Sequence, residues 1–192
     1  QKQQVGRAAT RLLKSGQTIY LDAGTTAFEM ARAIGQGLPQ VTHLNIVTHG
    51  ISIVTELAGR TPYHLQLIGG EVYQNALSTV GPVALTQIAG LKIDLFFMGA
   101  GGVDGTQGWS NSNHVEAVVK RAVANRAAVV AASAVVIDLA LARHAASVTT
   151  TARKSGRTAA PTSAWARPAA TSAHRTVLPP RSVASEMVSV PV

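Results

Sequence analysis

Length, composition and charge set the first limits on what this chain can be. It has 192 residues, of which 46% are hydrophobic, and a formal net charge of +8. This length suits one domain with a core of its own. The lack of cysteine excludes disulfide bonds and thiolate metal sites, and no apolar run reaches the ~20 residues that span a membrane. With no visible signal peptide, we expect a cytoplasmic protein.

Apolar periodicity predicts helices and strands that alternate along the chain. The expected helices cover residues 5–13, 25–34, 51–57, 80–88 and 114–126, and strands are expected at residues 18–22, 44–48, 64–68, 93–98 and 129–137. Asn113 is expected to cap the last helix. Such alternation predicts an α/β fold, Rossmann-like, with a mostly parallel sheet and helices on both faces.

The most informative segment follows the first expected strand and reads Asp-Ala-Gly-Thr-Thr at residues 22–26. We expect Gly24 to allow a tight turn and Thr25 and Thr26 to open a helix. Free backbone amides, two hydroxyls and the positive end of the helix dipole are the parts of a phosphate site. Asp22 repels a phosphate, so we expect it to accept hydrogen bonds from sugar hydroxyls or loop amides, or simply to shape the turn.

Small and polar residues also follow the other expected strands, namely Thr48, His49, Gly69, Gly70, Gly99 and Gly101. The carboxyl ends of parallel strands share one edge, where α/β sheets bind ligands. For His49, a hydrogen bond to a phosphate or hydroxyl and a tolerated loop residue both stay open. For Gly69 and Gly70, we expect close backbone approach or a positive φ, with a purely structural turn as the alternative.

In this order, the segments resemble the C-terminal sensor domain of DeoR-family transcriptional regulators. The resemblance runs from about residue 4 to residue 126 and rests on residues 21–26, 47–48, 67–70 and 94–100, on Gly81, Gly108, Asn113 and Glu116, and on residues 119–121. It implies a fold like ribose-5-phosphate isomerase and the binding of a phosphorylated sugar or related metabolite. It also implies no cofactor, a homo-oligomer, and DNA contact only through an N-terminal winged helix-turn-helix domain, which would lie before residue 1.

The resemblance also makes Lys120 a candidate ligand contact, together with Glu116 on the same helix. The alternative is that Glu116 and Lys120, four positions apart, form only a surface ion pair. The family usually has Asn where His49 stands. It also usually has an Asp-Ser-Ser-Lys stretch where residues 131–139 read AASAVVIDL.

We therefore expect a sensor domain over residues 1–138 and a tail over residues 139–192. Of the last 48 residues, 30 are Ala, Ser, Thr or Pro, and residues 127–192 carry 7 Lys or Arg against 2 Asp or Glu. Such a composition buries little apolar surface, so the tail is predicted to be disordered. A further hypothesis is that it is an out-of-frame reading of a GC-rich gene.

An enzyme is the main alternative, and a sugar-phosphate isomerase is its best form. Related isomerases have an Asp-Gly-Ala-Asp pattern where residues 98–101 read MGAG, and neither Met98 nor Gly101 can transfer a proton, although Asp104 is near. The spacing of glycines over residues 99–105 misses the dinucleotide fingerprint, and the histidines have no metal-ligand spacing. We therefore expect a protein that binds its ligand without transforming it.

Overall fold

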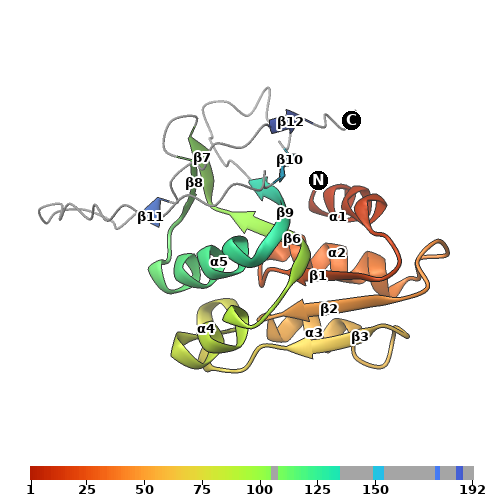
Figure 1. Ribbon diagram of the computed structural model, residues 1–192, viewed down its shortest axis with the longest axis horizontal. Coiled ribbons are helices and arrows are strands. Elements are labelled where there is room, and N and C mark those ends of the chain that lie inside the picture. The colour runs from red at the N-terminus through yellow and green to blue at the C-terminus, as the bar shows by residue number, and fades with distance from the viewer. Residues whose placement is uncertain (105–107, 135–148, 154–175, 178–184, 188–192) are drawn as a thin grey trace, which may run out of the picture.

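The computed structural model describes residues 1–104, 108–134, 149–153, 176–177 and 185–187 (Figure 1). The predicted alternation is confirmed. The helices are α1 (Lys2–Ala9), α2 (Thr25–Gly35), α3 (Ile51–Leu57), α4 (Gly81–Ala89) and α5 (His114–Arg126), with short 3-10 turns at Thr10–Leu12 and Gln74–Ala76. The strands that follow the prediction are β1 (Gln17–Leu21), β2 (Leu44–Thr48), β3 (His64–Leu67), β6 (Ile93–Ala100) and β9 (Ala127–Ala134).

These five strands form a parallel sheet in the order β9-β6-β1-β2-β3. Two further strands, β10 (Thr149–Arg153) and β12 (Ser185–Met187), extend it antiparallel beyond β9. The prediction of an α/β fold with a mostly parallel sheet is therefore confirmed. The rest of the segment over residues 139–192 lies outside the described residues, apart from β11 (Thr176–Val177), so its predicted disorder stays a prediction.

Two small hairpins were not predicted. One joins β4 (Glu71–Tyr73) to β5 (Ser78–Val80), and the other joins β7 (Gly102–Asp104) to β8 (Gly108–Asn111). Strands of three or four residues are too short to show an alternating pattern. Both hairpins follow the carboxyl end of a sheet strand, so they add to the edge where the predicted site lies.

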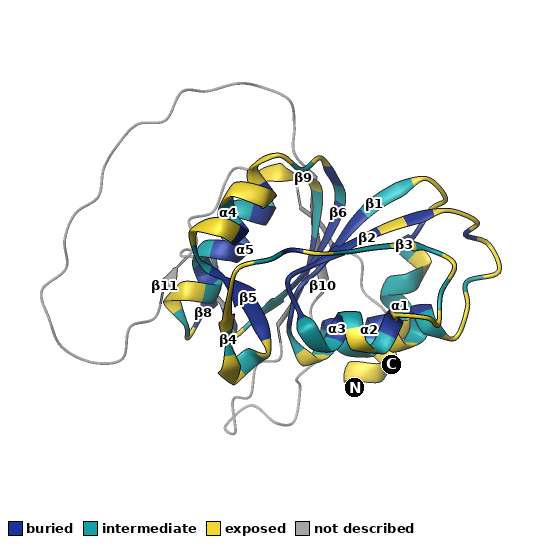
Figure 2. Cartoon of the chain, turned by 90° about the horizontal axis from the view of Figure 1, so that it is seen from below, coloured by how far each residue is buried: buried dark blue, intermediate teal, exposed yellow. Residues whose placement is uncertain are grey.

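The sheet separates two hydrophobic layers. Successive side chains of a strand point to opposite faces. Ile19 therefore packs with α1, α2 and α3, whereas Tyr20 packs with α4 and α5. Figure 2 shows the buried strands between helices whose outer surfaces are exposed. Helices thus cover both faces, as predicted.

The order of the strands places one topological switch point between β1 and β6. The chain proceeds from β1 to β2 and β3 on one side, and then returns to β6 and β9 on the other side. Asp22 follows β1, and its amide donates to the carbonyl of Phe97 in β6 (3.1 Å). In open α/β sheets, ligands bind outside the strand ends at such a point.

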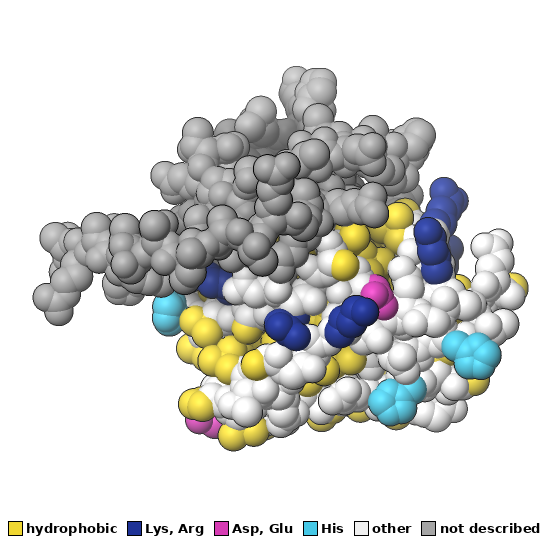
Figure 3. Space-filling view, viewed as in Figure 1, with side chains coloured by type: hydrophobic (Ala, Val, Ile, Leu, Met, Phe, Trp, Pro, Cys, Tyr) yellow, Lys and Arg dark blue, Asp and Glu magenta, His cyan; other side chains and the backbone are white. Residues whose placement is uncertain are grey.

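None of the described helices combines the length and apolar character needed to cross a bilayer. On the face drawn in Figure 3, the Lys and Arg side chains do not form one broad patch, and hydrophobic side chains gather near α4. In α4 itself, Val83 is 58% exposed.

Candidate functional site

Asp22 lies at the centre of the site and is fully buried. Its Oδ1 accepts a hydrogen bond from the amide of Ala23 (2.9 Å), and its Oδ2 accepts one from the amide of Gly99 (2.7 Å). Its Oδ2 also lies 2.9 Å from Nζ of Lys120. Of the roles predicted for Asp22, acceptance from loop amides is confirmed, whereas contact with sugar hydroxyls stays a prediction.

Lys120 turns inward from α5 and is only 7% exposed. Its ammonium donates to the carbonyl of Gly99 (2.7 Å) and pairs with Asp22. The suggested surface pair between Glu116 and Lys120 does not form within the described part of the chain. Lys120 thus uses two of its three N–H donors inside the protein, and a role as a ligand contact stays a prediction.

His49 follows β2 and is fully buried beside Asp22. Its Nδ1 lies 3.0 Å from the hydroxyl of Tyr20, and its Nε2 lies 3.6 Å from Oδ1 of Asp22. A carboxylate only accepts, so the electrostatics favour a proton on Nε2 and a hydrogen bond from the Tyr20 hydroxyl to Nδ1. His49 is therefore a packed member of the site rather than a tolerated loop residue.

Burial and charge together set the protonation of this cluster. Burial opposes ionisation of Asp22, but Lys120, His49 and the Gly99 amide outweigh it and lower the pKa of the carboxyl below its ordinary value. Burial lowers the pKa of His49 to about 4, against the attraction of Asp22. Burial, with Asp22, raises the pKa of Tyr20 well above its ordinary value. At neutral pH Asp22 is therefore a carboxylate and His49 a neutral imidazole.

The amino end of α2 is open, as the sequence predicted. Gly24 occupies the N-cap position, which has no side-chain cap, and the first intrahelical bond runs from Phe28 N–H to the Gly24 carbonyl (3.0 Å). Thr25 is exposed and Thr26 is partly exposed. Backbone amides ahead of the first intrahelical bond can donate to an anion.

The reason predicted for Gly24 was wrong. Its φ of −78° and ψ of 163° are extended values that any residue adopts, so the turn does not require glycine. A Cβ built on Gly24 would meet no atom within 4 Å. Neither backbone strain nor packing explains this glycine, whereas the open space in front of α2 lets an anion approach the amides closely.

The side chain of Thr48 connects the end of β1 to the segment after β2. It is fully buried, and its hydroxyl donates to the carbonyl of Leu21 (2.7 Å) and accepts from the amide of Gly50 (2.9 Å). A Cβ on Gly50 would lie 3.0 Å from Cα of Ala23. The segment after β2 therefore packs directly against the turn before α2, and Thr48 positions that turn.

Gly69 and Gly70 connect β3 to the hairpin of β4 and β5. Gly70 has a φ of +145°, and a Cβ there would collide with the carbonyl oxygen of Val80, so the predicted positive φ and close approach are both confirmed. The amide of Gly69 donates to Oε1 of Gln87 (3.0 Å). These contacts are structural, and contact of either glycine with an effector stays a prediction.

Gly99 and Gly101 lie at the end of β6, on the opposite side of the switch point. A Cβ on Gly99 would lie 3.1 Å from Oδ2 of Asp22, so a side chain there would press on the buried carboxylate. The amide of Gly101 donates to the carbonyl of Ser110 in β8 (2.9 Å). Glu116 lies in the first turn of α5, where its amide donates to Oδ1 of Asn113 (3.2 Å), which confirms the predicted cap.

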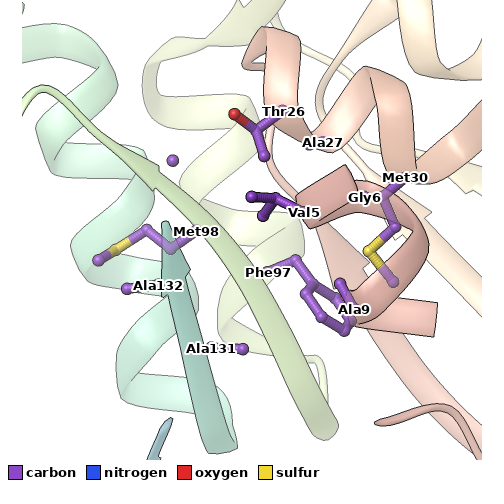
Figure 4. A pocket seen from close by; sticks show the side chains of 11 residues that line it. Val5, Gly6, Ala9, Thr26, Ala27, Met30, Phe97, Met98, Ala131 and Ala132 are labelled. Atoms are coloured by element: carbon purple, nitrogen blue, oxygen red, sulfur yellow. The ribbon is translucent and has the colours of Figure 1, made fainter. Parts of the chain in front are cut away.

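A small apolar pocket lies beside this cluster, between α1, α2, β6 and β9 (Figure 4). Its volume is about 30 Å³, and Thr26 contributes the one side-chain oxygen to its lining. Val5 of α1 and Phe97 of β6 line it too. This pocket has no cation or set of donors for a phosphate, and it meets the site only at Thr26 and Gly99. No cluster of three metal-ligating side chains is present among the described residues.

Sequence reasoning missed two members of the site. Tyr20 contacts His49 and also packs edge-on against the ring of Phe96, with centroids 5.4 Å apart. Thr79 of β5 donates through its amide to the carbonyl of His49 (2.8 Å). A hydroxyl-bearing ring inside an apolar strand was a usable signal for Tyr20. Thr79 lies in a hairpin that no pattern predicted.

Comparison with known proteins places these features in a family. The sequence profile described as the DeoR C terminal sensor domain matches residues 1–139. The HTH-type transcriptional regulator GolR of Listeria innocua is 31% identical over 126 residues, which cover 66% of this chain and 48% of that protein. An uncharacterized HTH-type transcriptional regulator of Bacillus subtilis, YulB, is 29% identical over 126 residues, with 66% and 47% covered.

A putative aga operon transcriptional repressor of Escherichia coli O157:H7 is 30% identical over 120 residues, which cover 62% of this chain and 43% of that protein. The chain thus spans about half the length of the curated relatives it matches. These relatives are transcriptional regulators, in agreement with the prediction that the chain is not an enzyme.

Among solved structures, a D-ribose-5-phosphate isomerase in complex with phospho-erythronic acid matches with a TM-score of 0.50. The two sequences are 14% identical, and the match covers 68% of this chain and 49% of the isomerase chain. At this identity the likeness shows the fold alone, and it confirms the expected resemblance to ribose-5-phosphate isomerase.

Proposed function

We propose, from the premise that this chain belongs to the family of DeoR C terminal sensor domains, that it binds a phosphorylated sugar for a transcriptional regulator of sugar metabolism. The phosphate would contact the amides and hydroxyls of residues 24–26. The sugar would extend along the carboxyl edge of the sheet toward β6 and α5. The complete regulator would contact DNA through a helix-turn-helix domain ahead of this one.

The observation that carries this proposal is the open amino end of α2 at the switch point of the sheet. Gly24 leaves free space where any other residue would place a side chain, although its backbone angles do not require glycine. Thr25 and Thr26 add hydroxyl donors at the same place. Free amides, hydroxyls and the helix dipole together favour an anion there.

The charge of the buried cluster is consistent with an anionic ligand. Asp22 alone would repel a phosphate near the start of α2. Lys120 lies 2.9 Å from its carboxylate and neutralises it. The neutralised pair lets an anion approach without a buried negative charge behind the turn, and the backbone amides then provide the attraction.

The contact between α1 and α2 offers a route from the effector to the rest of a regulator. A Cβ on Gly6 would lie 2.7 Å from the backbone of Glu29 and Met30, so the two helices touch almost backbone to backbone. A shift of α2 on effector binding would therefore move α1. We expect an oligomer whose arrangement changes in this way, since an effector acts through its different affinity for two states.

A sugar-phosphate isomerase is the alternative, and only the fold favours it. Turnover separates the two functions. We expect purified protein to bind a sugar phosphate in calorimetry and to leave it unconverted after prolonged incubation. Conversion to an isomer would contradict the sensor function.

A double substitution tests the phosphate site itself. Thr25→Ala with Thr26→Ala removes both hydroxyls without touching the buried core, because neither side chain is buried. We expect the affinity for the sugar phosphate to fall about tenfold or more, at an unchanged melting temperature. Thr86→Ala on α4, another exposed helix threonine, is the matched control and should bind like the unmodified chain.

A further inference from the structure

Three buried polar side-chain atoms at the site have no hydrogen-bond partner among the described residues. They are Oγ of Ser78, Nδ2 of Asn111 and Nε2 of His49, which faces Oδ1 of Asp22 at 3.6 Å, beyond hydrogen-bond distance. The three residues are 0%, 8% and 0% exposed. Buried polar groups in folded proteins are nearly always hydrogen-bonded, and those that are not call for a specific reason. Ser78 and Asn111 have no role in the phosphate site described above.

Ser78 is held close to His49. It lies in β5, and its backbone pairs with Gly50, the residue after His49, in an antiparallel bridge. The next residue, Thr79, donates its amide to the carbonyl of His49 (2.8 Å). The unpartnered atoms of Ser78 and His49 therefore come from adjacent backbone segments at the carboxyl end of β2.

Asn111 belongs to the same end of the sheet. It lies in β8, next to Ser110, whose carbonyl accepts the amide of Gly101 at the end of β6 (2.9 Å). Two residues later, the side-chain amide of Asn113 donates to the hydroxyl of Tyr73. Tyr73 pairs with Ser78 across the β4–β5 hairpin. Ser78 and Asn111 thus lie in two hairpins that α5 joins at its amino end.

The neighbour of Ser78 provides a comparison. The hydroxyl proton of Thr79 is used, since it is donated to the carbonyl of Ile68, and the oxygen also lies 3.3 Å from the carbonyl of His49. The hairpin is therefore anchored through Thr79, and the fold gains no hydrogen bond from the hydroxyl of Ser78. A serine that is buried without a bond destabilises the free protein, because alanine would fit there without the cost of desolvation.

We propose that Ser78, Asn111 and His49 form a hydroxyl-binding subsite that recognises the polyol part of the effector. This inference rests on the proposed function and extends it from the phosphate to the sugar. His49 and Asn111 supply N–H donors, and Ser78 supplies a group that both donates and accepts. Such a set matches the hydroxyls of a polyhydroxylated phosphate ester, whereas inorganic phosphate bound at the start of α2 has no polyol part to reach it. A site that bonds a ligand hydroxyl discriminates strongly against ligands that lack it.

Two substitutions test the subsite, Ser78→Ala and Asn111→Leu, which remove the polar atoms and keep a similar side-chain shape. Calorimetry measures their affinity for D-ribose 5-phosphate, D-fructose 6-phosphate, sn-glycerol 3-phosphate and inorganic phosphate. For the sugar phosphate that the unmodified chain binds best, each variant should lose affinity about tenfold or more. Affinity for inorganic phosphate should change by less than about twofold.

Melting temperatures without any ligand give a second readout. Ser78→Ala should melt at the same temperature as the unmodified chain or higher, whereas Thr79→Val should melt lower because it loses an existing hydrogen bond. A drop for Ser78→Ala, with unchanged affinity for the sugar phosphate, would show a structural hydroxyl and overturn the subsite. Binding of the sugar phosphate that neither variant alters would overturn it as well.

The binding measurements distinguish an error in the subsite from an error in the proposed function. If the unmodified chain binds none of the four phosphates, the sensor function for these ligands fails, and the subsite fails with it. If it binds a sugar phosphate, and Thr25→Ala with Thr26→Ala weakens that binding while Ser78→Ala and Asn111→Leu do not, only the subsite is wrong.

Discussion

The ammonium of Lys120 and the carboxylate of Asp22 form a buried ion pair across the topological switch point, with 2.9 Å between Nζ and Oδ2. Both groups also bond to the backbone of Gly99, one to its carbonyl and the other to its amide. This arrangement fixes the ends of β1 and β6 and the middle of α5 relative to one another. The open start of α2 lies two residues beyond Asp22, so this junction determines its position.

Removal of one partner of this ion pair should therefore lower the free energy of unfolding. Lys120→Met leaves the carboxylate of Asp22 buried without its cation, and such a loss typically costs about 3–5 kcal/mol. We expect urea denaturation to show a fall of this size in the free energy of unfolding. Lys92→Met, at an exposed position, is the matched control and should stay within about 0.5 kcal/mol of the unmodified chain.

The pair can also be tested as a unit. Lys120→Met combined with Asp22→Asn removes both charges and should recover part of the stability that Lys120→Met alone loses. If Lys120→Met were as stable as Lys92→Met, the ion pair would not hold the junction together.

The buried imidazole of His49 predicts a dependence of stability on pH. The pKa of His49 is lowered from 6.5 to about 4. Between these values the unfolded chain binds a proton that the folded chain does not, so stability falls as the pH falls through this window. The full effect is roughly 3 kcal/mol, and it is complete near the lower pKa. Urea denaturation between the two pH values measures it.

His49→Asn provides the control, because it removes the titrating group and introduces the residue that the family usually carries there. The variant should lose most of the slope in that window. Asp22 does not explain such a slope, because its pKa lies below its ordinary value of 3.8 and its contribution is lost only at lower pH. A variant with the slope of the unmodified chain would contradict the assignment to His49.

Substitutions at two glycines should separate an effect on helix packing from an effect on ligand binding. Gly6→Val forces a side chain against the backbone of Glu29 and Met30, where even a Cβ would lie 2.7 Å away, and should cost roughly 2 kcal/mol or more. Gly24→Ala enters open space with suitable backbone angles, so stability should change by less than about 0.5 kcal/mol. The new methyl group should nevertheless weaken binding of a sugar phosphate. Thermal denaturation and calorimetry on both variants measure the two effects.

Periodicity predicted the sheet and its helices because these elements are long enough to repeat a pattern. The bounds of β2, α3 and α5 agree with the prediction to the residue. The hairpin of β4 and β5 was missed because three-residue strands carry no period. Ser78 and Thr79 therefore had no predicted place, although both border the site.

The grouping of the candidate residues at one edge of the sheet was predicted, whereas binding of an effector there stays a prediction. Because parallel strands end together, the strand ends and glycine-rich turns predicted that these residues share one edge of the sheet, and Asp22, His49 and Gly99 do lie together there. The direction of Lys120 was left open between a ligand contact and an exposed pair, because a lysine four residues after Glu116 also suggests a surface ion pair. Its spacing of three residues from both Ala117 and Val123, which are buried, was the available signal.

The most direct test of the account is a crystal structure of this chain with the sugar phosphate that it binds most tightly. The account predicts a phosphate within hydrogen-bond distance of the amides and hydroxyls of residues 24–26, and an intact pair between Asp22 and Lys120. A phosphate bound at another part of the chain, with the start of α2 unoccupied, would contradict it.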